Sequence, residues 1–122
     1  MLTVYGLKNC DTCRKARGWL DGKGIAHKFL DVRADGVAKA DVARWVNAKG
    51  WESVLNKRGT TWRGLADADR EGVDEVRAVA LMVEHPALIK RPVFEVDGSK
   101  AGGKVVIGFG AAEQKALAGL LG

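Results

Sequence analysis

The pattern of hydrophobic and polar positions predicts an alternation of strands and amphipathic helices. Residues 2–5 are β-branched and aromatic and predict a strand that Gly6 closes, while residues 25–32 predict a second strand. Between them, apolar residues recur at helical spacing, at Cys13, Ala16 and Leu20. A strand, a helix and a strand in this order form a βαβ unit.

The middle of the chain is predicted to be helical. Residues from about 37 show helical spacing that Gly50 stops, and residues 51–65, without a clean period, predict helical turns and loop. A further helix should end before His85-Pro86, because the residue that precedes a proline avoids helical geometry. The apolar positions that mark this helix are Val73, Val76, Val79 and Val83.

The last part of the chain predicts a hairpin and a helix. Residues 92–96 and 105–107 read as antiparallel strands joined by a turn over residues 97–103, and residues 111–121 read as a helix. With the opening unit, these elements give an α/β fold: a four-stranded mixed sheet with a helical insertion, in thioredoxin-like order. We expect one domain over residues 1–122.

Composition and charge narrow the functional classes. The 122 residues are 47% hydrophobic and 29% charged, as in soluble globular proteins. No apolar run approaches the roughly 20 residues that cross a bilayer, and the start lacks the features of a signal peptide, so we expect a cytosolic protein away from membranes. The net charge of +5 is spread along the chain without a recognition motif, so we expect no direct nucleic-acid binding.

Both cysteines of the chain, Cys10 and Cys13, fall where the first strand gives way to the first helix. A helix N-terminus lowers the pKa of a cysteine, and nearby basic residues should add to this effect: Lys8, Arg14 and Lys15. Cys13 heads the apolar stripe and should be partly buried, whereas Cys10 precedes the stripe and should face solvent. We therefore interpret Cys10 as the attacking thiol and Cys13, one turn on, as the resolving thiol.

Two other interpretations of the cysteines remain open. A zinc site needs four ligands, and the candidates beyond the cysteines are His27 and His85, each isolated in the sequence, so we expect no metal. The cysteines could also be unrelated buried residues, because a free cysteine packs as a small hydrophobe.

Several motifs together resemble those of the arsenate reductase (ArsC) family, over nearly the whole chain. They include Asn-Cys-Asp-Thr at residues 9–12, Arg-Gly-Thr-Thr-Trp-Arg at 58–63, Glu-His-Pro at 84–86 and Ile-Lys-Arg-Pro at 89–92. The second of these is characteristic of the YffB-type, or ArsC-like, reductases. The sequence is also similar to the Spx transcriptional regulators, which share the paired cysteines and the Glu-His-Pro segment.

The resemblance implies a function and a set of site residues. By position, Cys10 would attack an oxyanion or a disulfide, with glutathione, glutaredoxin or thioredoxin as the reductant. Arg58 and Arg91 match arginines that hold the anion and stabilise the thiolate, a task suited to a planar guanidinium. Pro92 matches the cis-proline that lies beside the cysteines. From the residues alone, the arginines could equally be solvated surface charge, and Pro92 the start of an edge strand.

Two departures from the arsenate enzymes favour disulfide chemistry over arsenate. Residues 105–109 lack the third arginine that those enzymes carry after the hairpin, and Cys13 offers an internal thiol. Our leading hypothesis is a monomeric thiol-dependent oxidoreductase without a bound cofactor, with glutathione as co-substrate. The rival is an Spx-like redox sensor that binds RNA polymerase, disfavoured by residues 58–63 and by the end of the chain soon after the last helix. A domain that holds glutathione without turnover is a third hypothesis.

Overall fold

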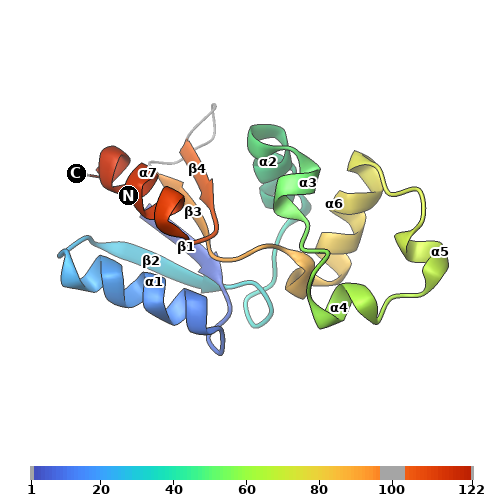
Figure 1. The fold of residues 1–122 in the computed structure, drawn as a ribbon, viewed down its shortest axis with the longest axis horizontal. Coiled ribbons are helices and arrows are strands. Elements are labelled where there is room, and N and C mark those ends of the chain that lie inside the picture. Colours follow the sequence, from blue (N-terminus) through green and yellow to red (C-terminus); the bar gives the residue numbers. More distant parts are fainter. Residues whose placement is uncertain (1, 97–103, 122) are drawn as a thin grey trace. The chain divides into compact units, whose positions relative to one another are not determined.

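The computed structural model describes residues 2–96 and 104–121 (Figure 1). The chain divides into two compact units, one formed by the residues up to Asp35 together with those from Arg91 onward, and the other by Gly36 to Lys90. The expectation of a single domain over residues 1–122 stays a prediction.

The first unit is built on a four-stranded mixed sheet in the order β2-β1-β3-β4. Its strands are β1 (Leu2–Gly6), β2 (His27–Asp31), β3 (Val93–Val96) and β4 (Lys104–Ile107). Strand β1 is parallel to β2 and antiparallel to β3, and β3 is antiparallel to β4. The predicted βαβ unit, hairpin and mixed sheet are confirmed. The turn predicted over residues 97–103 lies outside the described residues.

Helices α1 (Asp11–Gly22) and α7 (Ala111–Leu121) pack on one face of this sheet. In the register of the sheet, Phe94 lies opposite Val4 on one side and Val106 on the other, so three strands contribute to one apolar layer. Ala16 and Leu20 of α1 are fully buried against this layer, as their helical spacing predicts. Burial of each large apolar side chain stabilises the unit by about 1.5–3 kcal/mol, which fixes the position of α1 and of its first turn.

The second unit is helical. It contains α2 (Lys39–Lys49), α3 (Trp51–Val54), α4 (Thr60–Arg63), α5 (Asp67–Arg70), α6 (Glu75–Glu84) and the 3₁₀ helix η1 (Pro86–Leu88). Gly50, at a φ of 84°, separates α2 from α3, a backbone conformation that favours glycine. Trp45 is fully buried, whereas Trp62 is only half-buried. Backbone hydrogen bonds from Asn56 to Leu88 and from Lys90 to Val54 join the segments that follow α3 and η1.

The predicted apolar face of α6 is correct at Val79 but wrong at Val76. Val76 is 78% exposed, and the buried residues of the helix are Ala78, Val79, Leu81 and Met82. The helix begins only after Asp74, whose carboxylate accepts a hydrogen bond from the Arg77 N–H at 2.9 Å, so Val73 lies outside it. Two apolar stripes compete in this segment. The one with Leu81 and Met82 removes more apolar surface from water and is therefore favoured.

Candidate active site

Cys10 and Cys13 lie at the junction of β1 and α1. Cys10 is the N-cap of the helix, with extended backbone, and its carbonyl accepts a hydrogen bond from the Arg14 N–H at 3.0 Å. Cys13 lies in the first helical turn and is fully buried, while Cys10 is half-buried; both are free thiols. The predicted order of exposure is confirmed, although each cysteine is more buried than the sequence predicts.

Gly6 provides the space that the buried sulfur occupies. A Cβ atom at Gly6 would lie 2.5 Å from Sγ of Cys13, a separation at which something must shift. The sulfur of Cys13 therefore packs directly against the last residue of β1. A glycine at the end of this strand is required by close packing, because the backbone at this position has no positive φ.

The surroundings shift the pKa values of the two thiols in opposite directions. Burial is the largest influence on Cys10 and would raise its pKa, but the combined effects of hydrogen bonds from the backbone and side chain of Cys13, and of the hydrogen bond and charge of Arg91, lower it. Burial also dominates at Cys13, where the neighbouring Cys10 adds to it, and the pKa rises to about 11. Cys10 is therefore the thiol that ionises first.

The positive charge that assists Cys10 comes from Arg91, and not from the basic residues near it in sequence. Arg14 instead pairs with the carboxylate of Asp11, three residues earlier on the exposed surface of α1. The hydrogen bond and charge of Arg14 hold the pKa of Asp11 below its usual value. The predicted direction of the Cys10 pKa shift is confirmed. The expected help from the basic residues near it in sequence is corrected, whereas the role of Arg91 agrees with what the family resemblance implied.

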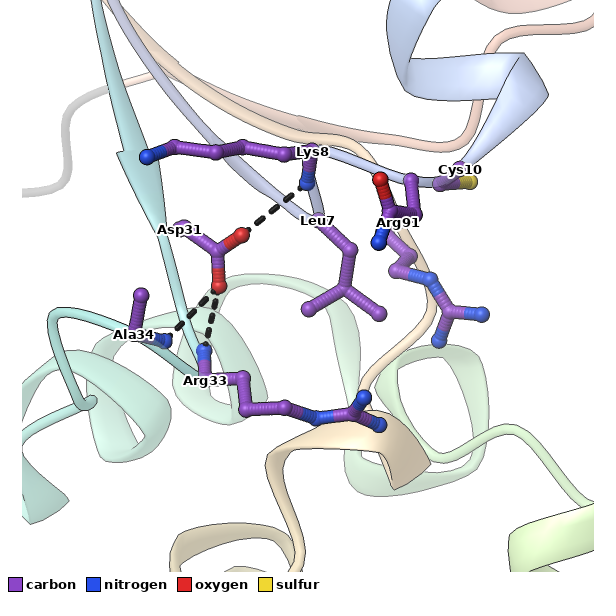
Figure 2. Close-up of a pocket in the computed structure, with 8 residues that line it drawn as sticks. Leu7, Lys8, Cys10, Asp31, Arg33, Ala34 and Arg91 are labelled. Atoms are coloured by element: carbon purple, nitrogen blue, oxygen red, sulfur yellow. Dashed lines mark hydrogen bonds between the residues drawn. The ribbon is translucent and has the colours of Figure 1, made fainter.

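A pocket with a volume of about 460 Å³ opens beside Cys10 (Figure 2). Its walls come from the loop after β1, the loop after β2 and the residue before Pro92. These segments meet because β1 and β2 are parallel neighbours whose carboxyl ends lie at one edge of the sheet. The polar and charged residues that line it are Lys8, Asn9, Cys10, Asp31, Arg33 and Arg91.

Asp31 ties the two loops of the pocket together. The side chain is nearly buried, and its carboxylate accepts backbone hydrogen bonds from Lys8 at 3.0 Å, Arg33 at 2.8 Å and Ala34 at 2.9 Å (Figure 2). The hydrogen bond from Ala34 is the main cause that lowers the pKa of Asp31, and together with the bonds from Lys8 and Arg33 and the charge of Lys8 it outweighs the opposing effect of burial. The carboxylate is thus ionised and holds the loop before Cys10 against the loop after β2.

The remaining residues of the predicted site fall in different parts of the structure. Arg91 lines the pocket with Cys10, and the peptide bond between Arg91 and Pro92 is cis, as the resemblance implied. Arg58 belongs to the helical unit, where it is exposed, and its carbonyl accepts a hydrogen bond from Arg63 at 2.6 Å. A role for Arg58 in anion binding stays a prediction.

Arg33 and Asp31 were not recognised from the sequence as residues of the site. Their position offered a signal, since both lie at or just after the end of β2, and the carboxyl ends of parallel strands are where α/β proteins place their ligands. Among residues 2–96 and 104–121, no group of three or more His, Cys, Asp or Glu side chains could hold a metal ion. None of the helices in these ranges is both long and apolar enough to cross a membrane.

Comparison with known proteins identifies the family of this cysteine site. The model of the ArsC family matches residues 5–117, a range that includes both cysteines and the cis-proline. The chain belongs to the ArsC family. An uncharacterised protein of Haemophilus influenzae is 41% identical over 116 residues, which are 95% of this chain and 97% of that protein.

Solved structures of ArsC relatives share the fold. The YFFB protein superposes with a TM-score of 0.90 at 39% identity over the whole of both chains. An arsenate reductase (ArsC) related protein from Brucella melitensis has a TM-score of 0.73 at 41% identity, covering 94% of this chain and 92% of that one. The Spx regulators are distant homologues: the global transcriptional regulator Spx of Listeria innocua is 24% identical over 76% of this ArsC-family chain and 72% of its own.

Proposed function

We propose that this ArsC-family protein is a thiol-disulfide oxidoreductase in which Cys10 is the nucleophile and Cys13 the resolving thiol, with glutathione as the reductant. The observation that carries the proposal is the pair of opposed pKa shifts within one helical turn. A thiolate at the helix N-terminus beside a protonated, buried thiol is the arrangement that two-step disulfide exchange requires. Membership of a family named for a reductase supports the same class of activity.

In the first half of the reaction, the Cys10 thiolate attacks one sulfur of a disulfide substrate. A bond forms between Cys10 and the substrate, the substrate S–S bond breaks, and one substrate thiolate leaves and takes a proton from water. Cys13 then loses its proton to solvent and attacks Sγ of Cys10. The second substrate thiol leaves, and a disulfide between Cys10 and Cys13 remains. The substrate gains the two electrons that the two cysteines lose.

The high pKa of Cys13 suits a resolving thiol, because the thiol stays protonated until the mixed disulfide at Cys10 has formed. The reduced Cys10 raises this pKa both through its charge and through its side-chain hydrogen bond. When Cys10 enters a mixed disulfide it carries no charge, so both of these effects are removed and the pKa of Cys13 falls. Burial remains, so resolution stays slower than attack at neutral pH.

Glutathione would regenerate the dithiol. One glutathione thiolate attacks Sγ of Cys10 in the internal disulfide, which frees Cys13 and leaves a mixed disulfide between Cys10 and glutathione. A second glutathione attacks the glutathione sulfur of this bond, glutathione disulfide leaves, and Cys10 returns as a thiolate. Arg91 stabilises that thiolate, and Pro92 lies next to Arg91, directly before β3. Arg58 remains a candidate for the anionic part of the substrate.

Mass spectrometry after treatment with oxidised glutathione tests the proposal. The wild type should lose two hydrogens as the internal disulfide forms, Cys13→Ser should retain one glutathionyl group, and Cys10→Ser should stay unmodified at neutral pH. Thr12→Ser, an exposed change in the same turn, serves as the control and should behave as the wild type. Equal modification of the two cysteine variants would refute the assignment of roles. Binding of glutathione without any covalent change would favour a binding domain instead.

A second candidate function is favoured by the similarity to Spx: a redox-sensing regulator that uses the same cysteines and binds RNA polymerase. The two candidates predict different complexes, because an oxidoreductase has no need of a stable polymerase partner. A pull-down with the polymerase α-subunit, on reduced and oxidised protein, separates them. A stoichiometric complex would favour the regulator.

A further inference from the structure

We propose that Arg33 is the residue that recognises a carboxylate of the thiol partner, so that the pocket selects small anionic disulfides of the glutathione class over neutral or cationic ones. This inference rests on the proposed function and adds the chemistry of the partner to it. It assigns recognition of the carboxylate to a residue of the sheet unit that carries Cys10, whereas Arg58 belongs to the helical unit.

The position of Arg33 supports this role. Arg33 lines the same pocket as Cys10 and Arg91, and Figure 2 shows its guanidinium directed to the side of the pocket where the guanidinium of Arg91 lies. The Lys8 side chain extends the other way in the same view. The Arg33 guanidinium has no ion-pair or hydrogen-bond partner among the described residues, while its backbone N–H is held by Asp31 at 2.8 Å. The backbone is therefore anchored and the charged group is available.

The field in the pocket is positive although an acidic residue lines it. The carboxylate of Asp31 already accepts hydrogen bonds from three backbone N–H groups, so it is not available to neutralise a guanidinium. Arg91 acts on the Cys10 thiolate, which it stabilises by a hydrogen bond and by charge. Because the Lys8 side chain also extends away from this side of the pocket, Arg33 is the cation placed to receive an anionic group of the partner away from the reacting sulfur.

The size and chemistry of the pocket indicate the kind of partner. A volume of about 460 Å³ falls within the range of pockets that hold small organic molecules. An arginine fork pairs bidentately with a carboxylate, which adds geometric selection to the charge. In the mixed disulfide with Cys10, a glutathionyl group would place its sulfur at Cys10 while a carboxylate reaches Arg33.

The test compares three disulfides that differ in charge. In a Cys13→Ser background, which retains the first adduct, the rate of adduct formation at Cys10 is measured by mass spectrometry with oxidised glutathione, neutral 2-hydroxyethyl disulfide and cationic cystamine. Arg33→Gln should slow the reaction with oxidised glutathione up to about fivefold, the loss expected for one exposed charge pair. It should leave the neutral disulfide unchanged and slightly accelerate cystamine. Arg33→Lys should recover part of the loss.

Lys28→Gln is the matched control, because Lys28 is exposed on β2 and does not line the pocket, yet its loss changes the net charge equally. It should leave the order of the three rates unaltered. An Arg33→Gln variant that slows all three disulfides alike, or none of them, would overturn the inference while the proposed function stands. Failure of all three disulfides to modify Cys10 in the parent would refute the proposed function, and the inference with it.

Discussion

The N-cap of α1 and the first turn of the same helix give their cysteines opposite properties. Cys10 is half-buried at the edge of the pocket, within reach of a guanidinium, and has a lowered pKa; Cys13 is fully buried against Gly6 and has a pKa of about 11. Both thiols lie at the N-terminal end of one helix, so the helix alone does not distinguish them. Burial against the strand and the position of Arg91 do. Changes to these contacts should therefore alter the difference in pKa and burial between the two thiols.

The largest effect is expected from pH. Attack by Cys10 should increase with pH and level off above its lowered pKa, whereas formation of the internal disulfide should continue to accelerate, because the thiolate fraction of Cys13 rises about tenfold per pH unit below its pKa. Between pH 6 and pH 8 we expect the resolution step to accelerate by up to about 100-fold. Acid quenching and mass spectrometry of the adduct and the internal disulfide measure both steps. Identical pH profiles for the two steps would contradict the difference in pKa between Cys10 and Cys13.

Gly6→Ala should disrupt the packing of Cys13 and leave the surroundings of Cys10 unchanged. The new Cβ would lie 2.5 Å from Sγ of Cys13, and overpacking of this kind costs about 1–3 kcal/mol of the free energy of unfolding. Chemical denaturation measures the loss. In a Cys13→Ala background the cost should largely disappear, because the sulfur is absent.

Gly18→Ala is the control for this substitution. A Cβ at Gly18 meets nothing within 4 Å, and alanine is the better helix former, so this change should stabilise the protein by roughly 0.5–1 kcal/mol. A loss of stability at Gly6 that persists without the Cys13 sulfur would show that the contact is not its cause.

Asp31→Asn should loosen the loop before Cys10 and leave the packing of Cys13 unchanged. The pKa of Asp31 is lowered in the fold, so its contribution to stability is present above the unfolded-state pKa of roughly 4 and is lost as the pH falls through the folded value. The variant should lose about 1–2 kcal/mol at pH 7, since hydrogen bonds to a charged group are exchanged for weaker ones. The difference from the wild type should shrink near pH 3.

Denaturation at the two pH values, beside the exposed change Asp21→Asn, measures this effect. A deficit that is the same at pH 7 and pH 3 would mean that the charge of Asp31 does not support the loop.

Arg91→Gln should produce the smallest effect. The pKa of Cys10 should rise only part of the way toward its ordinary value, because Cys13 still donates its hydrogen bonds. The pH dependence of alkylation by neutral iodoacetamide reports this pKa directly, with Lys28→Gln as the charge control. An unchanged Cys10 pKa would exclude Arg91 as a source of thiolate stabilisation.

The sheet unit was predictable because its signals are local. Strand composition, the glycine after β1 and the stripe of Cys13, Ala16 and Leu20 each depend on residues within one element. The division of exposure between the cysteines followed from that stripe. The face of α6 was not predictable in the same way, because its segment is apolar on more than one side and packing between elements selects the buried stripe.

The remainder of the site depends on residues that are distant in sequence. The cation beside Cys10 is Arg91, which lies next to it only because β3 pairs with β1. Arg33 and Asp31 join the pocket through the parallel pairing of β1 and β2. Pairing of strands is a tertiary event, so charges counted near Cys10 along the chain identified the wrong partners.

The contact between Gly6 and Cys13 also determines which sulfur must travel when the internal disulfide closes. The buried sulfur is confined by the strand behind it, so the N-cap residue has to swing inward. The loop that leads to Cys10 carries Leu7 and Lys8, which line the pocket. Oxidation should therefore change the wall of the pocket beside Cys10. The redox state of the two cysteine sulfurs would then determine the shape of the pocket.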